Sequence, residues 1–277
     1  MPLREVLRRS TDYLTQRKVE TPRLDAELLL ASALGITRLD LYLEHDRPLG
    51  ERELAACRTL LERRGRREPA AYVLGEWGFR RLTLKVDRRA LVPRPETEVV
   101  VQRCLELLRG SDEPRVLDVG TGTGAIALAI ADEHPGARVT ALDASADAVD
   151  LAQENATRTG LADRVTILRR DDVAGLPHFD LIVSNPPYVT ADEFEGLAPE
   201  IQEWEPREAL VENGLTETLS SRARDCLVPG GWVVLEVAED RAAGLARSLE
   251  AMGHAAVRVT ADLAGRPRVV EGQRRPA

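Results

Sequence analysis

The stretch Asn185-Pro186-Pro187-Tyr188 suits a planar amine or amide, and it follows the apolar run Leu181–Val183. The Asn185 side-chain oxygen and the Pro186 carbonyl can each accept one N–H of an NH₂ group, which aims the nitrogen lone pair in a fixed direction. The prolines fix φ and remove competing donors, and the Tyr188 ring can stack on an amide or face a cation. We predict that these four residues bind the substrate and that Asn185, Pro186 and Tyr188 are catalytic. A plain turn after a strand is the alternative.

Residues 118–124, with the sequence DVGTGTG, form a glycine-rich turn upstream of that stretch. Glycine lets the backbone turn tightly and leaves room for a ligand. The pattern also fits a dinucleotide fingerprint with Ala125 in the last position, so a nicotinamide enzyme stays open. The carboxylate of Asp118 favours the cationic amino acid end of S-adenosylmethionine over a pyrophosphate, which it would repel; anchoring the loop is its alternative role. The cofactor-binding residues predicted from this turn are Asp118, Gly120, Thr121, Gly122, Thr123 and Gly124.

Acidic residues after two later strands could complete a cofactor site. Asp143 lies about twenty residues beyond the turn, at the end of the next expected strand, where it can accept hydrogen bonds from ribose hydroxyls. Asp171 and Asp172 could bind an adenine amino group, with an acidic surface loop as the alternative. Together these motifs predict methyl transfer from S-adenosylmethionine to a nitrogen. Because no strong base is evident, catalysis would come mainly from positioning and electrostatics.

The elements before these motifs fall into two kinds. The first 68 residues read as helical, since Thr21-Pro22 is a typical helix start and residues 51–66 carry apolar side chains at helical spacing. Residues 72–86 are strand-like and are punctuated by glycine, which predicts a β-hairpin. We therefore expect a helical domain at 1–68, a hairpin linker at 69–90 and a cofactor domain at 91–277.

From about residue 96 onward, helical and strand patterns alternate. Strands separated by helices predict βαβ units and a mostly parallel sheet. Ligands of such sheets bind at the carboxyl ends of the strands, where both motifs lie. The expected helices include 98–108, 125–131, 146–157 and 240–252. The expected strands are 115–119, 138–142, 165–168, 179–183, 231–237 and 255–260, with a last edge strand at 268–270.

Composition and charge narrow the classes of function. The 277 residues are 43% hydrophobic, enough to bury a core. Residues 1–89 carry 19 Lys and Arg against 14 Asp and Glu, whereas the remainder carries 19 against 32. The first part could approach an anionic partner, with a solvated helix face as the alternative. Dispersed cysteines and histidines predict neither disulfides nor a metal site. Without a signal peptide or an apolar run of about 18 residues, we expect a cytoplasmic protein with no membrane contact.

Several motifs lie in a fixed order along most of the chain. They are residues 68–75 (EPAAYVLG), 91–98 (LVPRPETE), the glycine turn, 184–188 (SNPPY), 205–210 (EPREAL) and 262–266 (DLAGR). This ordered set resembles the motifs of the peptide chain release factor glutamine methyltransferases. One departure is Ala238, which follows Glu236-Val237 where that family usually carries glycine. Another is Asp172, where its members often carry an aromatic residue.

The resemblance implies an α/β protein with a Rossmann-like, seven-stranded S-adenosylmethionine-dependent methyltransferase domain, preceded by a small helical domain and a β-hairpin linker. It implies methylation of the side-chain amide nitrogen of the glutamine in the Gly-Gly-Gln motif of class-1 peptide chain release factors. Residues 120–124, Asp143, Asp172 and Asn185 would bind the methyl donor, and residues 185–188 would hold the glutamine. The helical domain would help to bind the release factor.

Three other functions remain as alternatives. DNA methyltransferases that act on the amino groups of adenine or cytosine use the same four-residue pocket, but they must flip a base and bind phosphates. The excess of acidic residues after residue 89 would repel DNA, so no direct DNA binding is expected. A non-catalytic binding protein would bind S-adenosylmethionine weakly, and a nicotinamide dehydrogenase would respond to NADH.

Overall fold

A computed structural model describes residues 1–276 and separates the chain into two compact units. The helical unit holds Met1–Glu76 together with Ala198–Trp204, and the sheet unit holds Trp77–Leu197 and Glu205–Ala277. The chain therefore passes from one unit to the other three times. The domain limits expected from the sequence do not include this short return segment, and they stay a prediction. No helix within residues 1–276 is long and apolar enough to cross a lipid bilayer.

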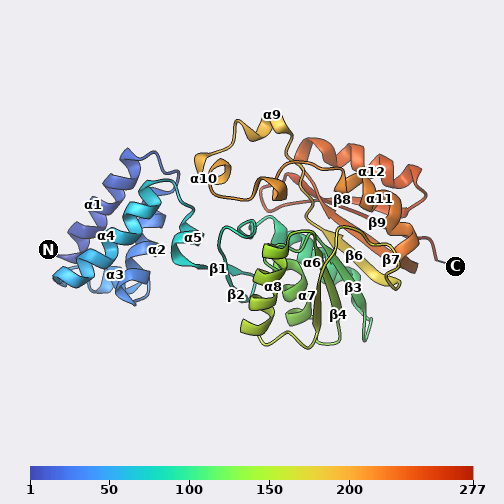
Figure 1. Cartoon of the computed structure of the whole chain (residues 1–277), viewed down its shortest axis with the longest axis horizontal. Coiled ribbons are helices and arrows are strands. Elements are labelled where there is room, and N and C mark those ends of the chain that lie inside the picture. The colour runs from blue at the N-terminus through green and yellow to red at the C-terminus, as the bar shows by residue number, and fades with distance from the viewer. Residues whose placement is uncertain (277) are drawn as a thin grey trace. The chain divides into compact units, whose positions relative to one another are not determined.

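The helical unit is built around a small apolar core. Pro22 begins its second helix, and Gly35 ends that helix with a left-handed φ of 64°, a conformation that glycine adopts without a Cβ penalty. Leu3, Leu14 and Leu30 are fully buried between the packed helices. The helices of this unit, labelled in Figure 1, are α1 (Leu3–Gln16), α2 (Pro22–Leu34), α3 (Asp40–Leu43), α4 (Glu51–Gly65), α5 (Ala70–Leu74) and α10 (Pro199–Gln202).

The predicted hairpin forms, but it is shorter than the sequence suggested. Its strands are β1 (Glu76–Phe79) and β2 (Leu82–Lys85). Residues 70–74, of which the last three were expected to be strand-like, are instead the short helix α5. Pro69 precedes this helix with φ fixed near −52°, and Gly75 ends it at φ 78°. These two flanking residues enclose a single helical turn, which is too short for its periodicity to be recognised.

The sheet unit contains the predicted seven-stranded sheet, in the order β5-β4-β3-β6-β7-β9-β8. The first five strands in this order run parallel, and β9 pairs antiparallel with both β7 and β8. The last strand of the chain, β9, was expected at the edge of the sheet. It lies instead between β7 and β8, because it forms an antiparallel hairpin with β8 and also pairs with β7. The strands are β3 (Arg115–Val119), β4 (Arg138–Asp143), β5 (Val165–Arg169), β6 (Phe179–Ser184), β7 (Leu227–Glu236), β8 (Ala255–Ala261) and β9 (Pro267–Gln273).

Helices cover both faces of this sheet. Because neighbouring residues of a strand point to opposite faces, each strand contributes apolar side chains to both helical layers. Val116 packs with the helices α6, α7 and α8, whereas the next residue, Leu117, packs with α11 and α12. Figure 1 labels both groups beside the strands. The five helices are α6 (Thr97–Leu107), α7 (Ala125–Glu133), α8 (Ala146–Arg158), α11 (Leu215–Cys226) and α12 (Ala242–Ala251).

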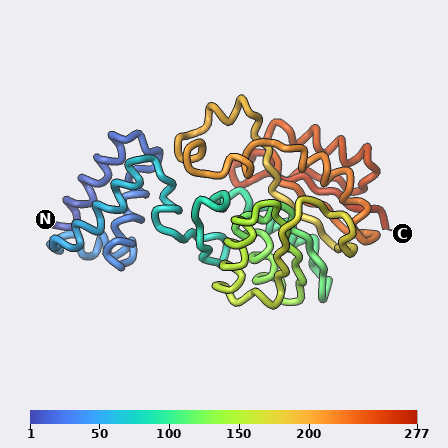
Figure 2. Tube along the Cα trace, viewed as in Figure 1, coloured from blue at the N-terminus to red at the C-terminus, as the bar shows by residue number. Residues whose placement is uncertain are grey.

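A long irregular segment follows β6. Only short helical turns lie between Ser184 and the start of α11, in the yellow to orange part of the trace in Figure 2. Besides α10, these turns are α9 (Ala191–Phe194) and the 3₁₀ turn η1 (Arg207–Ala209). The stretch Asn185–Tyr188 begins the segment, so its residues are held at the end of a central strand.

Candidate active site

The two predicted motifs are brought side by side by the pairing of β3 and β6. These strands are parallel neighbours, with Val119 opposite Ser184 in the last position of the ladder. Gly120 and Asn185 therefore begin adjacent loops at the carboxyl ends of their strands. The strand order changes direction at this point, since β4 lies on one side of β3 and β6 on the other. Open α/β sheets bind ligands at such a switch point.

The glycine turn requires glycine for its backbone conformation. Gly120, Gly122 and Gly124 have φ values of 72°, 55° and 82°, a region in which a side chain is strained. A Cβ on Gly124 would also lie 3.1 Å from Leu128 of α7, so this residue keeps the helix close to the turn. The backbone N–H groups of Gly120 and Thr121 both donate to the Leu142 carbonyl at 2.9 Å, which fixes the turn against β4.

Asp143 supports the glycine turn and lines the same cavity as Gly120 and Gly122. Its Oδ2 accepts the backbone N–H of Gly122 at 2.9 Å, and its Oδ1 accepts that of Ser145 at 3.0 Å. Ser145 also caps α8. Each oxygen of an ionised carboxylate can accept more than one hydrogen bond, so Asp143 keeps acceptor capacity for a hydroxylated ligand.

Asp118 lies beneath the turn and does not line a cavity. It is fully buried, and its Oδ2 accepts the Thr121 hydroxyl at 2.7 Å. Burial raises the pKa of Asp118 to about 7, although the bond from Thr121 opposes this rise. The direct cofactor contact expected from the sequence stays a prediction, and the bond from Thr121 fits the other role considered for Asp118, which is to anchor the loop.

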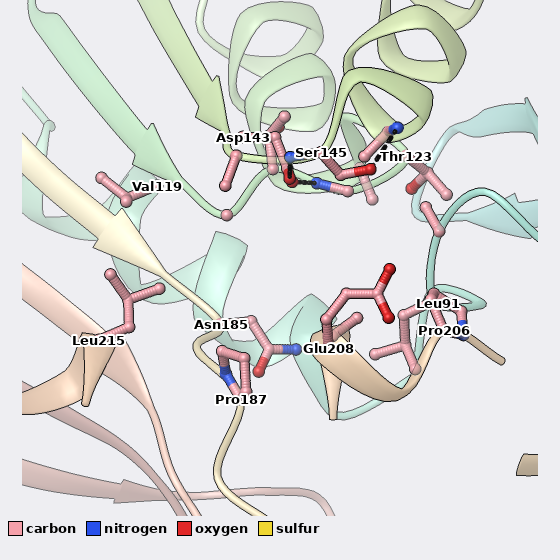
Figure 3. Close-up of a pocket in the computed structure, with 18 of the residues that line it drawn as sticks. Leu91, Val119, Thr123, Asp143, Ser145, Asn185, Pro187, Pro206, Glu208 and Leu215 are labelled. Carbon is pink, nitrogen blue, oxygen red and sulfur yellow. Dashed lines mark hydrogen bonds between the residues drawn. The ribbon is translucent and has the colours of Figure 1, made fainter. Parts of the chain in front are cut away.

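A cavity of about 340 Å³ opens between the two motifs (Figure 3). Asp143 and Ser145 lie on one side of it, and Asn185 and Pro187 lie on the other. Apolar atoms form most of its wall, but polar and charged side chains also line it, including Asp143, Arg170 and Asn185. The predicted site residues that line it are Gly120, Thr121, Gly122, Thr123, Asp143, Asp171, Asn185 and Pro187.

The remaining predicted residues are not on the cavity wall. Gly124 serves the backbone, as described above, and Pro186 is buried behind its neighbours. Asp172 is exposed, and its Oδ1 accepts Arg170 Nη2 at 2.7 Å and the Ala174 N–H at 3.0 Å. The bond from Arg170 is the main reason that the pKa of Asp172 is lowered. Asp172 thus holds its own loop, and the neighbouring Asp171 is the acidic residue that reaches the cavity.

Tyr188 has an indirect position. Its hydroxyl lies 3.3 Å from Glu236 Oε1 at the end of β7, to which it donates, and its backbone carbonyl accepts Arg241 Nη1 at 2.6 Å. Burial raises the pKa of Tyr188 to about 12, so the phenol stays protonated. Tyr188 lines a second cavity beside α12 rather than the one that Asn185 lines. Its contacts fix the path of the loop after Pro187.

Sequence reasoning assigned no site role to two loops that complete the cavity. Residues 89–94 line it ahead of α6, and Pro206, Glu208 and Ala209 line it from η1. Arg94 links the two loops, because its Nη2 donates to Glu205 at 2.6 Å. Irregular loops have no periodicity to signal their position. The PRPETE and EPREAL motifs were the signals available, and they entered only through the family resemblance.

Two family models match the chain over most of its length. The PrmC N-terminal domain matches residues 5–75, and the Methyltransferase small domain matches residues 97–256. The chain is 43% identical over 281 residues to a release factor glutamine methyltransferase of Deinococcus radiodurans, with 99% of each sequence covered. The chain belongs to the release factor glutamine methyltransferase family.

Other relatives agree with this assignment. The release factor glutamine methyltransferase of Chlorobaculum tepidum is 41% identical over 273 residues, which cover 93% of this chain and 92% of the relative. The SAM-dependent O-methyltransferase of Thermotoga maritima shares the fold alone, with a TM-score of 0.51, 15% identity and 67% of each chain covered. The family resemblance drawn from the motifs is thus confirmed, and so is the fold.

Proposed function

We propose that this protein transfers a methyl group from S-adenosylmethionine to the side-chain amide nitrogen of the glutamine in the Gly-Gly-Gln motif of class-1 release factors. One observation carries the proposal beyond family membership. Asn185 and Pro187 line the same cavity as the glycine turn and Asp143. A donor on one wall and an amide on the other would therefore meet in one space. Because release factors act on ribosomes, we also propose that the protein works in the cytoplasm.

The cavity wall fits S-adenosylmethionine. A Cβ on Gly120 would lie 3.8 Å from Leu215, and one on Gly122 would lie 3.8 Å from Ala90. Both neighbours line the cavity, so side chains at these glycines would fill the space that the cofactor needs. Asp143 would bind the ribose hydroxyls, and Asp171 would bind the adenine amino group. When bound, the cofactor supplies an electrophilic methyl group on a cationic sulfur.

The residues of the chain do the orienting. An amide nitrogen is a weak nucleophile because its lone pair is delocalised into the carbonyl, so its position relative to the methyl group decides the rate. Asn185 Oδ1 would accept one N–H of the glutamine amide. The other would go to the backbone carbonyl of Pro186, which is bonded to the wall residue Pro187 although the Pro186 ring is buried. Two fixed acceptors turn the amide so that its lone pair faces the donor.

Mass spectrometry of a release factor tests the function directly. The protein is incubated with S-adenosylmethionine and a class-1 release factor, which is then digested. We expect a gain of one CH₂ unit on the peptide that holds the Gly-Gly-Gln glutamine, and no gain when that glutamine is replaced by alanine. Duplex DNA incubated in parallel tests the runner-up function. Methylated DNA together with an unmodified release factor would reverse the assignment.

A further inference from the structure

A chain of two hydrogen bonds runs from Asn185 into the interior of the sheet unit. Asn185 Nδ2 donates to Thr97 Oγ1 at 3.3 Å, and Thr97 Oγ1 donates to Glu236 Oε2 at 2.7 Å. Thr97 begins α6 and Glu236 ends β7, so the chain joins three elements that are far apart in sequence. Thr97 is 5% exposed and Glu236 is 1% exposed. Apart from accepting the Tyr188 hydroxyl through its other oxygen, Glu236 has no role among those assigned above.

The direction of this chain decides which way the amide of Asn185 points. An ionised carboxylate only accepts hydrogen bonds, so the single hydroxyl hydrogen of Thr97 goes to Glu236. The Thr97 oxygen can then only accept, and of the two ends of the Asn185 amide only the NH₂ group can donate to it. The Asn185 oxygen is consequently turned away from Thr97, and it stays available to accept a hydrogen bond from a substrate. A carboxylate two bonds away therefore makes Asn185 an acceptor at the cavity.

We propose that Glu236 is a positioning residue for methyl transfer, which acts through Thr97 to keep the Asn185 oxygen facing the amide of the substrate. This inference rests on the proposed function. It assigns a purpose to a carboxylate that is costly to bury and that lies outside the cavity. It also explains why a threonine, with one donor and one acceptor, occupies the position between the other two.

Protonation of Glu236 would reverse the chain. A neutral carboxyl group can donate to Thr97, whose hydroxyl can then donate to the Asn185 oxygen and occupy the acceptor that the substrate amide needs. Burial raises the pKa of Glu236 to about 7; the Thr97 bond, the charge of Arg268 on β9 and the Tyr188 hydroxyl lower it, and the charge of Glu96 raises it. The rate should therefore fall as the pH drops through this pKa, because the productive orientation needs the ionised form.

Substitution of Glu236 tests the positioning role. The side-chain amide of Glu236→Gln can donate to Thr97 at every pH, so we expect kcat to fall about ten- to hundredfold. The acidic limb of the pH profile of kcat should disappear, while the affinity for S-adenosylhomocysteine, measured by calorimetry, stays unchanged. Glu271→Gln is the matched control. Glu271 is an equally buried glutamate on β9, but it pairs with Arg103 and has no link to Asn185.

Substitution of Thr97 gives a second test that does not depend on the folding of the Glu236 variant. Thr97→Val removes the hydroxyl and should lower kcat to a similar extent, whereas Thr97→Ser restores the hydroxyl and should recover most of the lost rate. Equal values of kcat for Thr97→Val and Thr97→Ser would overturn the positioning role alone. A wild-type kcat and pH profile in Glu236→Gln would do the same. A wild-type protein that does not methylate the release factor would overturn the proposed function, and the role with it.

Discussion

The side-chain oxygen of Asn155 accepts the backbone N–H of Lys85 at 2.7 Å, although seventy residues separate them in sequence. Asn155 Nδ2 donates to the Lys85 carbonyl at 3.0 Å and to the Thr123 carbonyl at 2.9 Å. A single, fully buried amide on α8 thus satisfies the end of the hairpin strand β2 and one residue of the glycine turn. Asn155 is not on the cavity wall, yet its bond to Thr123 holds a residue that is.

Removal of this amide should destabilise the sheet unit. Asn155→Ala leaves the part-buried backbone groups of Lys85 and the buried carbonyl of Thr123 without this partner, and an unsatisfied buried group costs about 1–3 kcal/mol. We expect a loss of about 3 kcal/mol in the free energy of unfolding, measured in urea. Gln153→Ala, at an exposed position of the same helix, should stay within about 0.5 kcal/mol of wild type. Equal stability of the two variants would contradict the bridging role.

Truncation of Asn185 should affect the chemical step more than cofactor binding. Asn185→Ala removes an acceptor that orients the substrate amide. By analogy with the loss of one oxyanion-hole donor, kcat should fall about a hundred- to a thousandfold. Single-turnover methylation of a release factor measures this rate, and calorimetry with S-adenosylhomocysteine measures cofactor binding. Near-wild-type turnover would remove Asn185 from the catalytic residues.

Asp143 should matter chiefly for cofactor affinity. Asp143→Ala removes a carboxylate proposed to bind the ribose, and it also frees the backbone N–H groups of Gly122 and Ser145. A hydrogen bond to a charged group contributes about 1.5–3 kcal/mol, so the dissociation constant of S-adenosylmethionine should rise at least about tenfold.

Two neighbouring acidic residues serve as a matched pair for the same measurement. Asp171 lines the cavity and Asp172 does not. Asp171→Ala should weaken cofactor binding, whereas Asp172→Ala should leave the dissociation constant unchanged. The reverse result would return Asp172 to the cofactor site.

The helical unit contains a buried ion pair that should be sensitive to the loss of one partner. Asp25 Oδ2 lies 2.6 Å from Arg64 Nε, and Arg64 Nη2 lies 2.8 Å from Glu200 Oε1. Asp25→Ala leaves Arg64 with one of its two carboxylates, and breaking a buried pair typically costs about 3–5 kcal/mol. Hydrogen exchange of the amides in α2 and α4 should therefore accelerate. Asp12→Ala, which breaks an exposed pair with Arg8, should have little effect.

The sequence predicted the central part of the sheet well because its strands are short apolar runs bounded by turn residues. The expected limits of 115–119 coincide with β3, and those of the neighbouring strands are correct to within one residue. The carboxyl ends of parallel strands meet at one edge of a sheet, so the sequence also predicted that the glycine turn and Asn185 lie close together. Asp143 lines the cavity as expected for the end of β4.

Other features depend on contacts that a pattern cannot reveal. Asp118 and Thr121 were both assigned to the cofactor, and only the hydrogen bond between them shows that Asp118 is held under the turn. The Thr97–Glu236 pair spans 139 positions, and nothing in the spacing of these residues connects them. Strand β9 was expected at the edge but lies between β7 and β8. Its position depends on how the β8–β9 hairpin pairs with β7, and the composition of the strand does not reveal that.

The seven residues Ala198–Trp204 belong to the helical unit, although more than 120 residues of the sheet unit precede them. Both Arg64 and Arg67 pair with Glu200 of this segment. A protein shortened to begin at residue 77 would leave Glu200 without either arginine, and residues 1–76 alone would lack the carboxylate. The helical unit is therefore not a detachable cassette, and exchange of N-terminal regions between homologues would succeed only if this internal segment were exchanged with them.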